Sequence, residues 1–178
     1  MEILDIYDRN HLKTGKFKFR NDKSIKSGEY HLVIHACIFN KKNELLIQQR
    51  QPFKEGFSNL WDLTVGGSAI KGEDSFTALK REVFEEIGYK IEINPIRPYL
   101  TMDYDGGFDD IYIFHFDIDI NKLKLQQEEV KQVRFATKEE VLDLIRKNEF
   151  VPYKEELINL IFAFLDNTRG GFDEKKFK

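Results

Sequence analysis

The sequence predicts an α/β protein in which a mixed β-sheet is flanked by helices. Three observations predict this class. Short segments of apolar or alternating residues recur along residues 2–136, which is typical of strands. Residues 75–87 repeat apolar side chains at the spacing of an amphipathic helix. Near the C-terminus, residues 137–147 begin with TKEE, which looks like a capping box that opens a helix, and residues 153–166 have apolar side chains at helical spacing.

The length and composition fit one domain of ordinary size. The chain has 178 residues, of which 41% are hydrophobic and 33% are charged, as in globular proteins. We therefore expect a single domain over residues 1–178, with a β extension at residues 1–30 and a flexible tail at residues 167–178. Because Cys37 is the only cysteine, an intrachain disulfide and a multi-cysteine zinc site are excluded.

The charge and the start of the chain indicate the kind of partner. A net charge of −3 gives no general attraction for nucleic acid. The first residues, MEILDIYDRN, contain no apolar run of signal-peptide length, and no stretch approaches the length of a transmembrane helix. We expect a cytoplasmic protein that acts on a small molecule and binds neither nucleic acid polymers nor membranes. Residues 153–166 are read as core or as the face of a homodimer.

The predicted strands are short and end at turn residues, such as NKKN at residues 40–43 and DGGF at residues 105–108. In chain order they cover residues 2–7, 15–20, 30–40, 45–51, 61–65, 90–94, 99–104, 110–117 and 131–136. In the second segment, lysine or arginine alternates with phenylalanine from Lys16 to Arg20. These basic residues protect an exposed strand edge, or they form a rim for an anionic substrate; we favour the first interpretation. His31 and His35 share one face of the third segment and are interpreted as hydrogen-bonded sheet residues.

The helix at residues 75–87 separates apolar from acidic side chains. Asp74 or Ser75 suits its N-cap, and Gly88 suits its C-terminal cap. Its apolar arc consists of Phe76, Leu79, Val83 and Ile87. Glu82, Glu85 and Glu86 fall within another arc of about 100°. Carboxylates placed side by side repel one another, and a divalent cation such as Mg²⁺, which prefers oxygen ligands, removes that repulsion.

The spacing of residues 67–89 resembles the signature of the Nudix hydrolases, G-x5-E-x7-R-E-U-x-E-E-x-G-U, in which U is a bulky apolar residue. The matching residues are Gly67, Glu73, Arg81, Glu82, Val83, Glu85, Glu86, Gly88 and Tyr89. Only Tyr89 departs from the pattern, because an aliphatic residue is more usual there. The resemblance implies the Nudix α/β/α sandwich and a Mg²⁺-dependent diphosphatase, with Mn²⁺ as the alternative ion. Its substrate would be a nucleoside diphosphate linked to a second group, or a related organic diphosphate.

The resemblance also implies a role for each matching residue. Glu82, Glu85 and Glu86 would hold the metal together with the backbone carbonyl of Gly67. Arg81 would orient a glutamate, Glu73 would tie the loop to the helix, and Glu82 or Glu86 would activate the attacking water. Members of the family often keep a further carboxylate ligand later in the chain, so Glu129 is interpreted either as that ligand or as an exposed loop acid.

Residues outside the signature are candidates for binding the rest of the substrate. Arg50 ends a predicted strand, and its guanidinium suits a phosphate. Phe57, Phe108 and Asp109 belong to predicted loops and turns or lie beside them. Aromatic rings in such loops would suit stacking on a base.

Two other functions are weighed against hydrolysis. Residues 3–118, including GEYHLVIHACIFN, LLIQQR and FSNLWD, look like the Nudix branch related to isopentenyl-diphosphate isomerases. Such an isomerase needs a catalytic cysteine where this chain has Gly66 and a metal-binding histidine where it has Ser68, which disfavours isomerisation. A non-catalytic sensor that binds a nucleotide ligand would usually lack a signature glutamate, whereas this chain keeps all four.

Overall fold

The structure is a computed structural model that describes residues 2–20, 22 and 26–166. Its chain forms two compact units, Met1–Ala36 with Val65–Tyr112 and Cys37–Thr64 with Ile113–Lys178. We call them the signature unit and the second unit. The single domain expected over residues 1–178 stays a prediction, and the tail expected at residues 167–178 lies outside the described residues. Among the described residues, no helix has the length and apolar character needed to cross a membrane.

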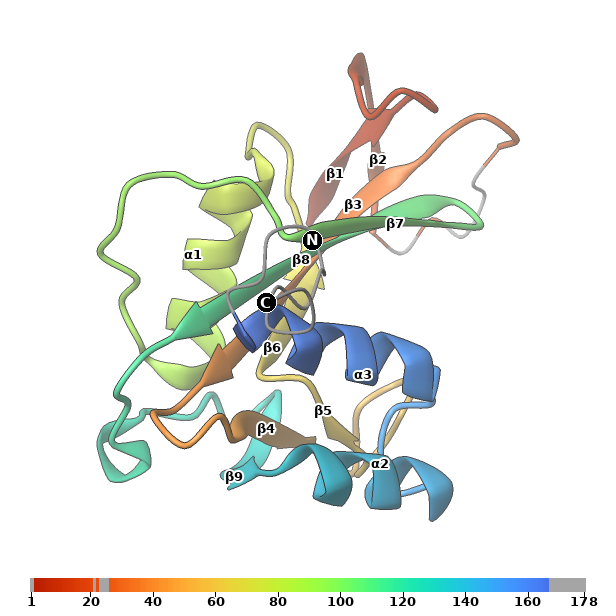
Figure 1. The fold of residues 1–178 in the computed structure, drawn as a ribbon. Helices are drawn as coiled ribbons and strands as arrows, with labels where there is room; N and C mark the ends of the chain where they lie inside the picture. Colours follow the sequence, from red (N-terminus) through yellow and green to blue (C-terminus); the bar gives the residue numbers. More distant parts are fainter. Residues whose placement is uncertain (1, 21, 23–25, 167–178) are drawn as a thin grey trace, which may run out of the picture. The chain divides into compact units, whose positions relative to one another are not determined.

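The strands of the signature unit, which Figure 1 labels, pair with one another. β1 (Ile3–Tyr7) and β2 (Lys13–Phe19) form a two-stranded hairpin. β6 (Val65–Ser68) pairs with the first half of β3 (His31–Phe39), and β7 (Leu100–Tyr104) pairs with β8 (Gly107–His115). Gly106, in the turn between β7 and β8, has a φ of 88°, which glycine adopts without a steric penalty.

Helix α1 (Ser75–Ile87) follows β6 and has the predicted caps. The Asp74 carboxylate accepts a hydrogen bond from the Thr77 backbone N–H at 2.7 Å, which satisfies an unpaired donor of the first turn. Gly88 ends the helix with a φ of 69°, the left-handed conformation of a C-terminal cap. The predicted apolar arc of the helix is buried as expected: Phe76, Leu79, Val83 and Ile87.

The strand predicted at residues 90–94 is wrong. These residues form no strand in the structure. Ile91 is buried, but Ile93 and the following Ile96 are exposed, and the described strands leave this segment unpaired. A run of alternating polar and apolar residues becomes a strand only when a neighbouring backbone forms hydrogen bonds with it. The alternation at residues 90–94 was therefore not sufficient to predict a strand.

The second unit is built around β4 (Leu45–Arg50), which pairs antiparallel with β5 (Trp61–Asp62) and β9 (Val130–Ala136). A short 3₁₀ helix, η1 (Ile120–Lys122), precedes β9. α2 (Lys138–Arg146) begins with the predicted capping box of Thr137 and Glu140. α3 (Glu155–Ala163) continues into the 3₁₀ turn η2 (Phe164–Asp166).

The strand predicted at residues 61–65 is divided into β5 and β6. Thr64 causes the break, because its buried hydroxyl donates to the Leu46 carbonyl at 2.5 Å and accepts from the Ile38 N–H at 2.9 Å. A side chain therefore replaces a backbone group between these strands. After this break, Gly66 and Gly67 lie within β6 opposite His35 and Ile34 of β3.

Candidate active site

The loop between β6 and α1 is held by the β1–β2 hairpin. The Lys71 N–H donates to the Ile3 carbonyl at 2.7 Å, and the Gly72 N–H donates to the Asp5 carboxylate at 2.9 Å. The Lys13 ammonium donates to the Glu73 carbonyl at 2.6 Å. The N-terminal hairpin therefore fixes the loop from which the signature helix starts.

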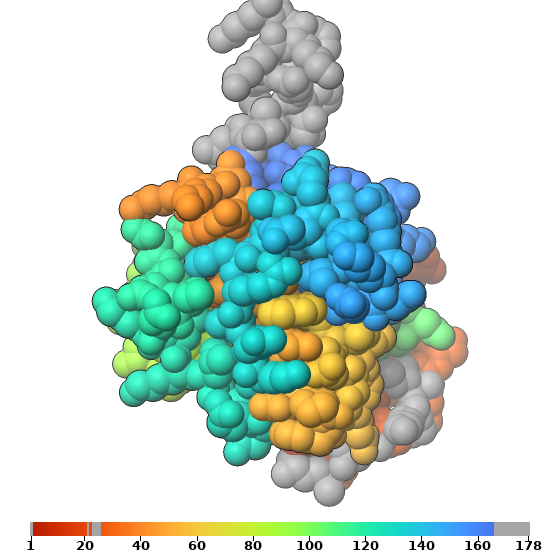
Figure 2. Space-filling model, turned by 90° about the horizontal axis from the view of Figure 1, so that it is seen from below, coloured from red at the N-terminus to blue at the C-terminus, as the bar shows by residue number. Residues whose placement is uncertain are grey.

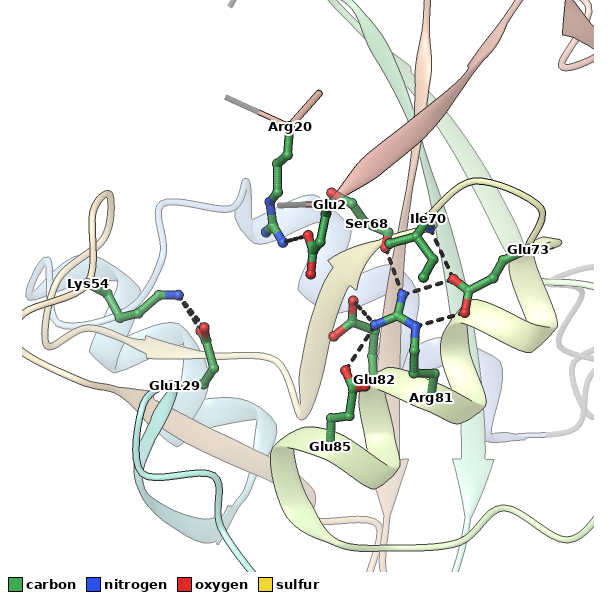
Figure 3. Close-up of polar contacts among 10 residues, drawn as sticks. All are labelled: Glu2, Arg20, Lys54, Ser68, Ile70, Glu73, Arg81, Glu82, Glu85 and Glu129. Carbon is green, nitrogen blue, oxygen red and sulfur yellow. Dashed lines mark hydrogen bonds and ion pairs between the residues drawn. The ribbon is translucent and has the colours of Figure 1, made fainter. Parts of the chain in front are cut away.

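Arg81 connects the end of this loop to α1 (Figure 3). Its Nε and Nη2 donate to the two oxygens of Glu73 at 2.7 and 2.9 Å, a bidentate pair. Nη2 also donates to the Ser68 carbonyl at 3.0 Å. Glu73 accepts a further hydrogen bond from the Ile70 N–H at 3.0 Å. Glu73 is thus hydrogen-bonded both to the loop and to the helix, and its part in the reaction stays a prediction.

Glu82, Glu85 and Glu86 of α1 are called the acidic cluster below. The remaining nitrogen of Arg81 contacts two of them. Nη1 lies 2.9 Å from a carboxylate oxygen of Glu82 and 3.0 Å from one of Glu85. The hydrogen bonds that Arg81 donates to Glu73 are the main cause that raises the pKa of Arg81, although burial opposes it. One guanidinium therefore lies among three carboxylates and stays charged.

The Glu82 side chain is pressed against the backbone of Gly67. A Cβ atom at Gly67 would lie 2.2 Å from the carboxylate carbon of Glu82, so residue 67 has to be glycine for this carboxylate to lie here. Glu82 is 8% exposed, and burial raises its pKa to about 7, although the charge and hydrogen bond of Arg81 lower it. Removal from water disfavours the charged form of an acid.

The acidic residues of α1 suit a hard divalent cation in their chemistry. The carboxylate of Glu82 lies against the backbone of Gly67, and the helix also carries the buried carboxylate of Glu86 and the more exposed one of Glu85. Oxygen ligands of this kind suit Mg²⁺. In the described part of the chain, no three His, Cys, Asp or Glu side chains form a group that could hold an ion, and Glu82 and Glu85 contact Arg81.

Three of the other predicted site residues belong to the second unit. The Arg50 guanidinium lies 3.5 Å from Asp62, and its buried Nε has no hydrogen-bond partner among the described residues. Phe57 is 51% exposed and has a φ of 49°, unusual for a bulky residue. Glu129 forms an ion pair with Lys54, and its carbonyl accepts from the Gln51 N–H. These two contacts join the segment at residues 51–60 to the one that precedes β9, and Figure 2 shows yellow-orange and teal atoms side by side on the surface. The roles of these three residues stay predictions.

Phe108 and Asp109 begin β8 in the signature unit and differ in exposure. Phe108 is 2% exposed, because it stacks on Tyr30 and contacts His11 edge-on. Its ring has no open face for a substrate, which corrects the expectation that it lines the binding pocket. Asp109 lies 3.5 Å from Nε2 of His35.

Gly66 and His35 also lie in close contact. A Cβ atom at Gly66 would lie 2.8 Å from Nδ1 of His35, so the histidine ring occupies the space that a side chain at residue 66 would need. This contact was not foreseen from the sequence, because only the register of β3 and β6 brings the two residues together. The adjacent His31 hydrogen-bonds the Gly106 carbonyl and the Tyr104 hydroxyl, both at 2.9 Å.

Comparison with known proteins gives the family. Residues 29–159 match the NUDIX domain. An uncharacterized Nudix hydrolase of Listeria monocytogenes is 46% identical over 162 residues, covering 90% of this chain and 95% of the relative. The crystal structure of DR0079 from Deinococcus radiodurans has a TM-score of 0.73 at 25% identity, and the match covers 90% of this chain and 97% of that one. An isopentenyl-diphosphate Delta-isomerase of Pectobacterium atrosepticum is 31% identical over 110 residues, covering 62% of this chain and 59% of the relative.

The chain belongs to the Nudix hydrolase family. The predicted fold class, an α/β protein with a mixed sheet and flanking helices, is confirmed by this membership and by the match to DR0079. The protein is thereby an enzyme of the hydrolase class, and its family supports hydrolysis of a diphosphate in a small molecule. Nudix hydrolases generally use divalent metal ions.

Proposed function

We propose that this protein is a Mg²⁺-dependent hydrolase that cleaves the diphosphate linkage of a nucleoside diphosphate joined to a second group, or of a related organic diphosphate. The observation that supports this most is the contact between Gly67 and Glu82. A carboxylate is kept buried at 8% exposure directly against a backbone that carries no side chain. Burying an acid is unfavourable unless a charge or hydrogen bonds compensate, and a cation held by these oxygens would compensate it.

The signature residues have two separate roles in this proposal. Glu82, Glu85 and Glu86 would hold the ion with the carbonyl of Gly67. Arg81 and Glu73 would fix the start of α1, since their bidentate pair joins the helix to the preceding loop. When bound, Mg²⁺ or Mn²⁺ offsets the charge of the phosphate oxygens and lowers the pKa of a coordinated water.

Glu82 is our candidate for accepting the proton of the attacking water, with Glu86 as the alternative. Its pKa of about 7 lies close to neutral pH, which suits a general base. The buried position of Glu86 in the next turn of the helix supports the alternative. Glu129 is retained as a further candidate ligand, and Arg50, Phe57 and Asp109 as candidate substrate-binding residues.

The isomerase remains the alternative from another reaction class. The relative from Pectobacterium atrosepticum carries that name, but the contact of Gly66 with His35 argues against the activity here. A cysteine at residue 66 would collide with the histidine ring, because its Cβ would come within 2.8 Å of Nδ1. A sensor without activity is disfavoured because the four signature glutamates are all present.

A screen with purified protein and Mg²⁺ tests the proposal. The panel contains nucleoside diphosphate sugars, dinucleoside polyphosphates, oxidised nucleotides, coenzyme A and prenyl diphosphates. We expect hydrolysis of at least one compound in ¹⁸O-labelled water, with the label recovered in a phosphate product. Conversion of isopentenyl diphosphate to its isomer without hydrolysis would support the isomerase, and tight binding without turnover would support the sensor.

A pair of variants connects this activity to the acidic cluster. Glu85→Gln should lower turnover even in excess Mg²⁺, because one proposed ligand loses its charge. Glu156→Gln is the matched control, since Glu156 is an exposed glutamate on α3. Equal turnover of the two variants would contradict the role of Glu85.

A further inference from the structure

We propose that Arg20, at the end of the N-terminal hairpin, binds a phosphate group of the substrate beside the acidic cluster. The inference rests on the proposed function and deepens it, because it adds a substrate-binding residue from outside the signature. It also gives Arg20, the last residue of the basic segment at residues 16–20, a role in a rim for an anionic substrate.

The hairpin is in the right place because it is bonded to the signature loop. The three hydrogen bonds to Lys71, Gly72 and Glu73 come from Ile3 at the open end, Asp5 in the middle and Lys13 near the closed end, so they join the whole length of the hairpin to that loop. The Lys71 ammonium also lies 4.0 Å from the centre of the Phe17 ring, a cation–π contact. The hairpin and the signature loop therefore form one connected structure.

The open end of the hairpin lies toward Glu82. Ile3 pairs with Phe19, and the Arg20 N–H donates to the Glu2 carbonyl at 3.1 Å, which leaves Glu2 and Arg20 as neighbours just beyond the strands. Figure 3 shows the two side chains joined by their ion pair, with Glu82 below them in that view. The open end is also bonded to the signature loop, since the Ile3 carbonyl accepts a hydrogen bond from the Lys71 N–H.

Arg20 is more readily available to bind a phosphate than Arg81 or Lys13. Arg81 is surrounded by Glu73, Glu82 and Glu85, and Lys13 is held by Asp5 and the Glu73 carbonyl. Arg20, in contrast, forms an ion pair with Glu2 at 2.5 Å in which the side chains are 50% and 43% exposed. Exposed ion pairs contribute little stability, so a phosphate can replace Glu2 at little cost.

The chemistry of a diphosphate calls for such a group. Ions held by the acidic cluster would neutralise part of the charge on the two phosphates, and a guanidinium can take two oxygens of one phosphate at once. Arg20 would then orient the substrate on the hairpin side of Glu82. In the free protein, the Glu2 carboxylate pairs with Arg20 in place of the phosphate.

Binding of methylenediphosphonate with Mg²⁺, measured by titration calorimetry, tests the proposal, because this probe is not hydrolysed. Arg20→Gln should weaken binding about tenfold, which corresponds to about 1.4 kcal/mol, and Arg20→Lys should recover part of the loss. Glu2→Gln should strengthen binding in the wild-type background and have no effect in Arg20→Gln. Lys16→Gln is the control, because Lys16 is an exposed lysine of the same strand that pairs with Glu29.

The outcomes separate this inference from the proposed function. If Arg20→Gln binds the probe as Lys16→Gln does, and has an unchanged KM for a substrate found in the screen, the role of Arg20 is refuted while hydrolysis stands. If wild-type protein neither binds the probe nor hydrolyses any compound of the panel, the proposed function itself fails. Melting temperatures of the variants show whether the hairpin is still folded, since a purely structural role would lower them together with binding.

Discussion

The carboxylate of Glu82 fills the space where a side chain at Gly67 would have to lie, since a Cβ atom there would be 2.2 Å from it. Glu82 of α1 can therefore lie here only if residue 67 of β6 has no side chain. Residue 67 has to be glycine because of the neighbouring Glu82 carboxylate and not because of a turn, since Gly67 lies within β6.

Gly67→Ala should consequently displace the Glu82 carboxylate. We expect metal-dependent hydrolysis to fall at least about tenfold, the usual size of effect when a metal ligand is misplaced, with a higher Mg²⁺ concentration needed for half-maximal rate. Gly28→Ala is the control. Its φ of 84° makes alanine strained by about 1 kcal/mol, yet a Cβ atom there meets nothing within 4 Å. A Gly67→Ala protein with normal Mg²⁺ dependence would show that Glu82 does not need this position.

Arg81→Lys should destabilise the protein and abolish most activity. Lysine cannot form the bidentate pair with Glu73 while also reaching Glu82 and Glu85, and breaking a largely buried ion network costs on the order of 3 kcal/mol. Thermal or denaturant unfolding measures this loss. Arg146→Lys offers a matched control, because Arg146 forms a bidentate pair with Glu155 at 2.8 and 2.7 Å on the exposed surface. Equal destabilisation of the two variants would remove any special role for Arg81.

The raised pKa of Glu82 predicts a pH dependence of stability. The folded protein holds this proton up to about pH 7, whereas an exposed glutamate releases it near 4.5. Because the folded state binds more protons in this window, its stability falls as the pH rises from 4.5 to about 7. The free energy of unfolding of the wild type should therefore fall relative to Glu82→Gln over this range.

Glu140 supplies a control of opposite sign for the same measurement. Its pKa is lowered, chiefly because it accepts a hydrogen bond from the Thr137 N–H at 2.8 Å. Its contribution to stability is present above its ordinary pKa and disappears as the pH falls, so the wild type should lose stability relative to Glu140→Gln on acidification. A pH profile of Glu82→Gln parallel to that of the wild type would show that Glu82 titrates normally.

The ion pair between Lys54 and Glu129 allows the role of Glu129 to be decided. If Glu129 is a metal ligand, as proposed, Glu129→Gln should need more Mg²⁺ for the same rate, and this is our expectation. If Glu129 only holds the loop at residues 51–60, then Glu129→Gln, Lys54→Gln and the double variant should have the same small effect, with unchanged Mg²⁺ dependence. Measurement of the rate against Mg²⁺ concentration distinguishes the cases. A shift toward higher Mg²⁺ in Glu129→Gln alone would identify Glu129 as a metal ligand.

Local sequence signals predicted the elements that local interactions stabilise. The caps of α1 at Asp74 and Gly88 and the capping box of α2 were foreseen, because a cap is a hydrogen bond between residues a few positions apart. The segment at residues 90–94 alternates like a strand but forms none, since the decision depends on a neighbouring strand that local sequence does not specify.

The sequence by itself determined the family and the spacing of the glutamates along α1, and the signature implied that Arg81 orients one of its glutamates. These follow from helix periodicity and from a signature confined to residues 67–89. Only the tertiary structure decided that Glu73 is the glutamate that Arg81 holds by two hydrogen bonds, that Glu82 lies against Gly67, and that His35 occupies the space beside Gly66. The reason is physical: each of these contacts joins residues from different elements or loops, so it exists only once strand register and packing are fixed.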